Sequence, residues 1–244
     1  MITLPELAHY STAFPDLDQA LSEPNGLLAF GGDLSVKRLV SAYQKGVFPW
    51  YSEDEPILWW SPDPRGLLAL DDLYISKSTQ KWLKKSTHTV TINHAFVDVI
   101  HACANIPRSP IVNASGDVIE NGTWITDEMV AAYIDLHQSG FAHSIEVWDQ
   151  EALVGGLYGV SLGGVFCGES MFHLQPNTSK LAFISLVKHM RQHNGLLIDC
   201  QMQNPYLASM GVQEVPRHIY LQQLKHAIAI SVPTSMWQPQ AMTI

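Results

Sequence analysis

Cysteine is scarce in this 244-residue chain, which contains only Cys103, Cys167 and Cys200. Three cysteines cannot pair completely, and no two of them have the CxxC spacing of a redox or zinc motif. The sequence therefore argues against a disulfide framework and against a cysteine-based zinc site. We expect reduced thiols in the core.

Long apolar runs are also absent. The longest, such as GLLAL and LLAFGG, are far shorter than the roughly 20 residues that cross a bilayer. The N-terminal segment MITLPELAHYST lacks a basic start followed by an apolar core. We therefore predict a cytoplasmic protein without membrane contact.

Positive charge is limited to 14 Lys and Arg residues against 23 Asp and Glu, a net charge of -9. This balance argues against broad, non-specific binding of nucleic acid. Within ISKSTQKWLKKSTH, however, four lysines recur at spacings that share one helix face: Lys77, Lys81, Lys84 and Lys85. The run fits either a solvated helix face or a local basic patch.

The chain is 46% hydrophobic, which is enough for one large domain or two small ones. Prolines 49, 56, 62 and 64 interrupt regular structure, and SPDPRG is typical of a rigid joint. We predict a small N-terminal domain over residues 1–62 and a larger domain over residues 63–244.

Helix signals occur at three places. Asp33 or Ser35 can cap a helix through VKRLVSAYQK, which Gly46 would end, and Thr126 can cap another through DEMVAAYIDLHQ. A third helix is predicted within residues 177–195, which end in Asn-Gly. Between the first two, the turn-rich segment from Pro107 to Gly122 predicts a long loop.

Strand signals surround the third helix. HSIEVWD, ALVGGLYGVSL and GVFCGESMF are separated by short turn signals, which predicts an antiparallel meander, and LLIDCQMQ predicts one more strand after the helix. The chain is therefore expected to be α+β. This order of elements is that of an acetyltransferase-like (GNAT-like) fold. The turn HLQPNTSK lacks glycine and any basic residue before Lys180, which disfavours a coenzyme A donor.

Two features of these strands suggest chemistry. Glu169 interrupts an apolar strand, where a carboxylate is costly to bury without a partner. In the last strand, alternation would place Asp199, Gln201 and Gln203 on one polar face. The polar face fits either an edge strand exposed to water or part of a catalytic site.

Seven segments, in nearly the same order along nearly the whole chain, resemble the leucyl/phenylalanyl-tRNA–protein transferase family: FPWY, WWSPDPRG, GTWIT, HSIEVW, GGLYGV, FCGESMF and LIDCQ. The resemblance implies transfer of Leu or Phe, and Met less well, from aminoacyl-tRNA to the N-terminal Arg or Lys of a protein, marking it for degradation. It also implies a GNAT-like C-terminal domain with a mostly antiparallel mixed sheet flanked by helices, and no metal or organic cofactor. We further expect a monomer.

The resemblance also implies roles for particular residues. Asp199 and Gln201 would form an electrostatic relay, with Glu169 and Ser170 beside the reacting end. Independently of the resemblance, we expect Asp199 to orient and polarise the attacking amine, directly or through Gln201, and Glu169 to attract a cationic partner. The aminoacyl side chain would bind in an apolar pocket, with the terminal adenosine near Tyr133; the pocket residues are Trp50, Trp124, Leu157 and Phe166. The four lysines would receive the tRNA acceptor stem. Whether Asp199 or Glu169 is the base stays open here.

Two alternatives compete with this interpretation: an acyltransferase of the same fold that uses coenzyme A or makes cell-wall peptide bridges, and a non-catalytic adaptor for tRNA or N-terminal signals. The chain departs from the family pattern at two places. The loop from Pro107 to Gly122 is longer than in the family, and the segment NPYLASMG after DCQ differs from the family's usual sequence. Because the loop runs into GTWIT, it could alter access to Trp124.

Overall fold

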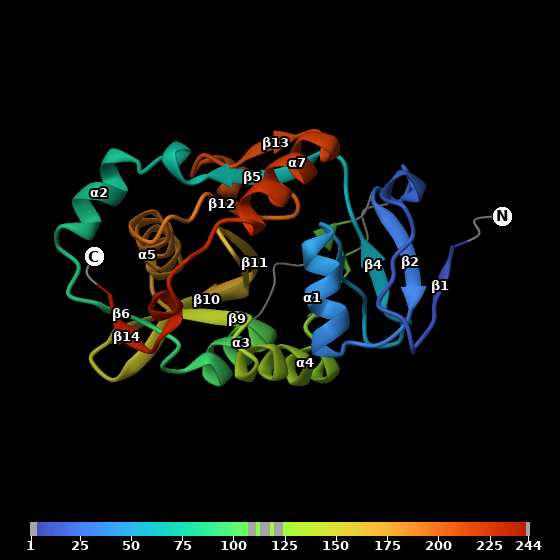
Figure 1. Cartoon of the computed structure of the whole chain (residues 1–244). Helices are drawn as coiled ribbons and strands as arrows, with labels where there is room; N and C mark the ends of the chain where they lie inside the picture. The colour runs from blue at the N-terminus through green and yellow to red at the C-terminus, as the bar shows by residue number, and fades with distance from the viewer. Residues whose placement is uncertain (1–3, 107–110, 113–117, 120–123, 243–244) are drawn as a thin grey trace.

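Two mostly antiparallel sheets organise the chain (Figure 1). The computed structural model describes residues 4–106, 111–112, 118–119 and 124–242. The smaller sheet has the order β1-β2-β4-β3, with β1 (Glu6–Leu7), β2 (Leu27–Gly31), β3 (Phe48–Pro49) and β4 (Leu58–Trp60). The predicted α+β class is confirmed.

The larger sheet has eight strands in the order β13-β5-β12-β11-β10-β9-β6-β14. Its strands are β5 (Arg65–Ala69), β6 (Thr89–Ile92), β9 (Ala142–Asp149), β10 (Ala152–Leu162), β11 (Val165–His173), β12 (Leu197–Asp199), β13 (Gln213–Val215) and β14 (Gln240–Ala241). The predicted meander is confirmed as β9, β10 and β11, and β12 then pairs parallel to β11.

The helices of the described residues are α1 (Val36–Gln44), α2 (Lys77–Leu83), α3 (Phe96–Asn105), α4 (Asp127–Gln138), α5 (Thr178–Gln192), α6 (Pro205–Ala208) and α7 (Arg217–Ile228), with 3-10 turns at Leu17–Gln19, Leu70–Asp72 and Thr234–Trp237. The predicted caps are confirmed, because Ser35 accepts a hydrogen bond from the backbone of Arg38 and Thr126 accepts one from Met129. None of the described helices is long and apolar enough to cross a membrane.

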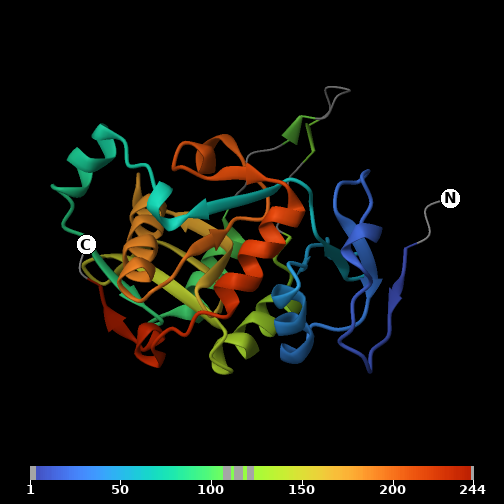
Figure 2. The same ribbon diagram turned by 45° about the horizontal axis from the view of Figure 1, so that its top comes forward.

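Hydrophobic cores lie on both faces of the larger sheet. On one face α5 packs against β9, β10 and β11, and on the other face α3 packs against the same strands. Neighbouring residues of β10 alternate between the cores, since Leu157 belongs to the first and Tyr158 to the second. The second core continues into α1 and the smaller sheet. Figure 2 shows α7 beside both α1 and β5, which brings distant parts of the chain together.

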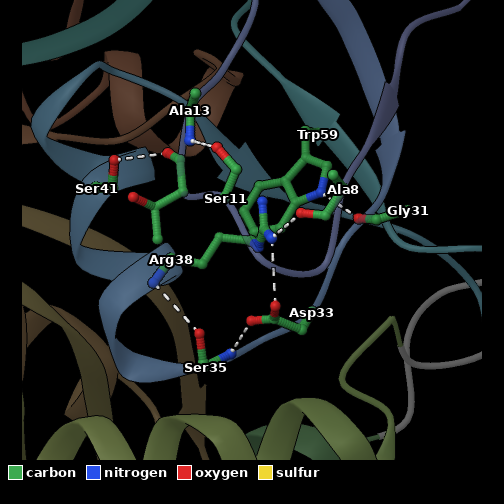
Figure 3. Close-up of polar contacts among 10 residues, drawn as sticks. Ala8, Ser11, Ala13, Gly31, Asp33, Ser35, Arg38, Ser41 and Trp59 are labelled. Atoms are coloured by element: carbon green, nitrogen blue, oxygen red, sulfur yellow. Dashed lines mark hydrogen bonds and ion pairs between the residues drawn. The ribbon is translucent and has the colours of Figure 1, made fainter.

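A buried arginine fastens the N-terminal segment to α1 (Figure 3). Nη2 of Arg38 donates hydrogen bonds to the backbone oxygen of Ala8 at 2.7 Å and to Oδ2 of Asp33 at 3.2 Å. Nearby, Nε1 of Trp59 donates to the backbone oxygen of Gly31 at 2.9 Å. These contacts order the end of the molecule that carries the smaller sheet.

The predicted domain boundary between residues 62 and 63 falls in the connection from β4 to β5. The division into two domains stays a prediction. Most of the predicted loop from Pro107 to Gly122 lies outside the described residues, and its described parts, β7 (Ile111–Val112) and β8 (Val118–Ile119), pair with each other. Buried positions for Cys103 and Cys167 agree with the expectation of core thiols.

Candidate active site

A pocket of about 730 Å³ opens where β11 and β12 part. Their parallel pairing ends at Cys167 and Asp199, and beyond these residues the two chain segments line the pocket instead of pairing. The pocket brings together seven of the residues predicted from the sequence: Trp50, Trp124, Leu157, Phe166, Glu169, Ser170 and Gln201.

The interior of the pocket is apolar. Leu157 and Phe166 are buried, Trp124 is half-buried, and Trp50 is 39% exposed. Further apolar side chains that were not predicted from the sequence also line the pocket, among them Phe183, Leu186 and Ile198. For the two residues of α5, the helical periodicity of the segment was a usable signal, since it places them on the side that faces the sheet.

A β-bulge positions Glu169. In the pairing of β10 with β11, Tyr158 lies opposite Ser170 and Gly159 lies opposite Gly168, so Glu169 is the extra residue. Bulges redirect a side chain out of the regular alternation of a strand and are common beside active sites. This bulge allows Glu169 and its neighbour Ser170 to line the same pocket.

The predicted polar face of the last strand is wrong for Asp199, whereas Gln201 and Gln203 both line the pocket. The strand β12 ends at Asp199, and Gln201 has a left-handed backbone with φ of 54°. As a result Ile198 and Cys200 line the pocket together with Gln201, whereas Asp199 is fully buried and is not among the lining residues. The alternation fails because the backbone of the segment bonds to Gly66 and turns, so it does not extend as a strand.

Asp199 has a full set of hydrogen-bond donors. Nε and Nη2 of Arg65 donate to its two carboxylate oxygens at 2.8 and 2.7 Å, the hydroxyl of Tyr220 donates at 2.7 Å, and the backbone N–H of Gln201 donates at 2.9 Å. Burial alone would raise the pKa of Asp199, but the charge and hydrogen bonds of Arg65 hold it below its ordinary value. The carboxylate is therefore ionised and fully occupied by donors.

Glu169 has a different environment. Its oxygens accept hydrogen bonds from the hydroxyl of Tyr133 at 3.0 Å and from Nε2 of Gln201 at 3.2 Å, and Tyr43 bonds to Tyr133 in turn. Burial raises the pKa of Glu169 to about 7 from its ordinary 4.5, against the lowering effect of the two tyrosine hydroxyls. Glu169 can thus gain or lose a proton near neutral pH.

The remaining predicted residues lie outside the pocket lining. Tyr133 is fully buried against Glu169, so its contact with an adenosine stays a prediction. The four lysines are exposed along α2 and just after it, at the end of the molecule opposite the smaller sheet (Figure 1). In the part of the chain that the structure describes, no group of three or more His, Cys, Asp or Glu side chains is placed to hold a metal ion.

The raised pKa of Glu169 predicts a pH-dependent effect on stability. The folded protein retains this proton more tightly than the unfolded chain, so the resulting stabilisation is complete below about pH 4.5 and is lost as the pH rises through about 7. Glu169→Gln removes this titration. Its free energy of unfolding, relative to the wild type, should rise across that window and level off above it.

Urea unfolding of both proteins from about pH 4.5 to about pH 8 measures this difference. Glu151→Gln, in an exposed turn, controls for the loss of one carboxylate. A difference between wild type and Glu169→Gln that stays constant with pH would contradict the raised pKa.

Comparison with known proteins agrees with this site. A family profile described as leucyl/phenylalanyl-tRNA protein transferase matches residues 67–225, and the profile of its N-terminal domain matches residues 32–63. The curated leucyl/phenylalanyl-tRNA–protein transferase of Pseudoalteromonas atlantica is 54% identical over 233 residues, covering 96% of this chain and 95% of the relative. The transferase of the same name from Tolumonas auensis is 53% identical over 231 residues, covering 95% and 94%.

Among solved structures, L-PGS from Bacillus licheniformis aligns with a TM-score of 0.37 and 10% identity, and the match covers 88% of this chain and 65% of that one. The sequence matches extend over nearly the whole chain at about half identity. The chain therefore belongs to the leucyl/phenylalanyl-tRNA–protein transferase family and is a transferase.

Proposed function

We propose that this transferase moves Leu or Phe, and Met less well, from aminoacyl-tRNA to the α-amino group of a protein that begins with Arg or Lys. The product would carry a new N-terminal residue that marks the protein for degradation. One observation carries the proposal: an apolar pocket has in its wall a carboxylate, Glu169, whose pKa is about 7.

The pocket suits the donor side chain. Leu157 and Phe166 provide a buried apolar surface, and Trp50 and Trp124 add aromatic surface. Burial of a leucine or phenylalanine side chain there contributes about 1.5–3 kcal/mol by removing apolar area from water. The aminoacyl ester would then lie near Glu169 and Ser170, which share the pocket wall.

The reaction needs one proton transfer and no strong base. The neutral amine attacks the ester carbonyl carbon, the amide bond forms, and the ester C–O bond breaks to release the tRNA terminal hydroxyl. An α-amino group has a pKa of about 7.7–8, close to that of Glu169 at about 7. Glu169 can therefore accept the amine proton and pass it to the leaving oxygen, which is efficient when the pKa lies near the working pH.

The sequence left open whether Asp199 or Glu169 is the base, and the surroundings of Asp199 favour a positioning role for it. Its lowered pKa and its four donors leave it a poor proton acceptor. Asp199 holds the backbone of Gln201, whose side-chain amide then reaches Glu169. The relay therefore positions groups, and the base is Glu169.

The proposed acetyltransferase-like (GNAT-like) fold of residues 63–244 and the small domain of residues 1–62 are consistent with this site. The site lies where the parallel strands β11 and β12 part, so an acyl donor and an amine can meet beside the sheet. Trp50, which follows β3 of the smaller sheet, also lines the pocket. Because aminoacyl-tRNA, the proposed substrate, is found in the cytoplasm, we also propose that the protein is located there.

A transfer assay tests the proposed function. The purified chain is incubated with Phe-tRNA that carries labelled phenylalanine and with a peptide that begins with Arg. Label should enter this peptide but not its N-acetylated form, and phenylalanyl-coenzyme A should be a poor donor. Glu169→Gln should lower kcat by about 100-fold or more, the usual contribution of a general base.

Melting temperature shows whether Glu169→Gln is folded. Absence of transfer by the wild type would refute the proposed function. Efficient use of the coenzyme A thioester would favour the other acyltransferase class. Full activity of a folded Glu169→Gln would exclude Glu169 as the base.

The exposed lysines of α2 predict how tRNA is held. Replacement of Lys77, Lys81, Lys84 and Lys85 by Ala should weaken the use of Phe-tRNA and flatten its salt dependence, by about 0.9 in the log–log slope for each lost phosphate contact. Activity with phenylalanyl-adenosine, which lacks the acceptor stem, should change little.

Lys37→Ala/Lys45→Ala is the control, because it removes exposed lysines on and beside α1. If both donors lose activity equally in the quadruple variant, the assignment of these lysines to tRNA is wrong.

A further inference from the structure

Arg65 connects four parts of the fold although it is completely buried. It lies at the start of β5, binds Asp199 of β12 through two hydrogen bonds, and donates through Nη1 to the backbone oxygen of Gly46 after α1 at 3.0 Å. Its guanidinium also lies 4.9 Å from the ring of Phe48 and 4.5 Å from the ring of Tyr220 in α7. Arg65 therefore has a single, fixed position.

This fixed position extends to the pocket through Asp199. The oxygen Oδ1 of Asp199, which is bound to Nε of Arg65, also accepts the backbone N–H of Gln201. On the other side, the backbone oxygen of Gln201 accepts the N–H of Gly66, the residue that follows Arg65. The N–H of Gln201 is thus held by Asp199, the ion-pair partner of Arg65, and its carbonyl oxygen is held by the residue that follows Arg65.

Gln201 needs such support, because its φ of 54° is a left-handed conformation that residues other than glycine rarely adopt. In this conformation its side chain lines the pocket and Nε2 donates to Oε1 of Glu169 at 3.2 Å. A continuous series of contacts therefore runs from Arg65 through Asp199 and Gln201 to Glu169.

We propose that Arg65, assisted by Tyr220, is a positioning residue of the transferase site. It fixes Asp199, so that the side chain of Gln201 stays turned toward Glu169. Because Asp199 is occupied by Arg65, Glu169 is the carboxylate that exchanges protons with the substrate. This inference rests on the proposed function for its kinetic consequence, but its structural consequence, the state of Glu169, can be measured without substrate.

An ion pair with a purely structural role would not affect the protonation of Glu169. A second buried ion pair in the chain serves as a comparison. Arg38 is also completely buried and is bound to a carboxylate, that of Asp33, at 3.2 Å. Its hydrogen bonds go to Asp33 and Ala8, and neither of these residues lines the pocket. Loss of the guanidinium fork at Arg38 tests stability alone.

The groups that act on Glu169 come from several elements. Burial raises its pKa. The hydroxyl of Tyr133 of α4 and that of Tyr43 of α1, which bonds to Tyr133, lower it, and Arg65 of β5 lowers it by its charge. Asp199 of β12 raises it by like charge. If the position of Arg65 is lost, Glu169 loses the hydrogen bond of Gln201 and a well-placed cation, and both losses favour the protonated form.

The test uses Arg65→Lys, which keeps the charge without the fork, with Arg38→Lys as the matched control. At saturating Phe-tRNA and peptide, Arg65→Lys should lower kcat by about tenfold or more, because small displacements of reacting groups strongly reduce the rate. The KM for the donor should stay within about twofold of the wild-type value. The NMR titration of ¹³C-labelled glutamate, with Glu169 assigned by its loss in Glu169→Gln, should shift upward by about 0.5 pH unit or more. Arg38→Lys should change neither quantity.

Tyr220→Phe provides a second variant if Arg65→Lys fails to fold, because it removes only the hydroxyl bound to Asp199 and keeps the ring beside Arg65. It should lower kcat by about threefold to tenfold and shift the Glu169 titration in the same direction.

A folded Arg65→Lys whose kcat and Glu169 pKa equal those of the wild type would overturn the proposal. A lower kcat without a change in the pKa of Glu169 would also overturn it, as would equal effects of Arg38→Lys and Arg65→Lys. For Tyr220→Phe, unchanged kcat and titration would do the same. If the wild type transfers no amino acid, the proposed function fails, and the titration alone still decides whether Arg65 positions Glu169.

Discussion

The buried ion pair between Arg65 and Asp199 joins the start of β5 to the end of β12, directly beside the pocket. Neither charge has access to water, and each is compensated by the other and by additional hydrogen bonds. Breaking such a pair typically costs about 3–5 kcal/mol, because one buried charge is left without a partner. In return the pair fixes the end of β12, where the sheet opens into the pocket. An apolar pair could fill the same space, but it could not hold the backbone N–H of Gln201.

The two carboxylates of the site are separated by their environments. Asp199 is surrounded by donors and stays ionised, whereas Glu169 lies against an apolar pocket and has a pKa of about 7. In many active sites, two acids have different catalytic roles because their environments give them different pKa values. Here Gln201 connects them, since it donates its backbone N–H to Asp199 and its amide to Glu169. In the proposed mechanism, Glu169 is the base and Asp199 is the residue that holds Gln201 in place.

Much of the fold could be predicted from the sequence because its signals are local. Caps such as Ser35 and Thr126, and the turns between β9, β10 and β11, depend on neighbouring residues alone. The pocket residues came from the family resemblance. The arrangement of the carboxylates depends on distant pairing: the bulge at Glu169 arises from the pairing of β10 with β11, and Arg65 is 134 residues away from Asp199. An aspartate inside LLIDC does signal that a buried cation is needed. It does not signal which one, and alternation along an extended strand wrongly placed Asp199 on the same exposed face as Gln201.

The separate roles of Glu169 and Asp199 can be tested with a crystal structure of the chain bound to a non-hydrolysable phenylalanyl amide of adenosine and a peptide that begins with Arg. We expect the phenylalanyl ring to lie among Trp50, Trp124, Leu157 and Phe166, with the peptide amine within hydrogen-bonding distance of Glu169. Asp199 should remain bound to Arg65 and should not touch either ligand. An amine bound directly to Asp199, with Arg65 displaced from that carboxylate, would show that Asp199 and not Glu169 is the base.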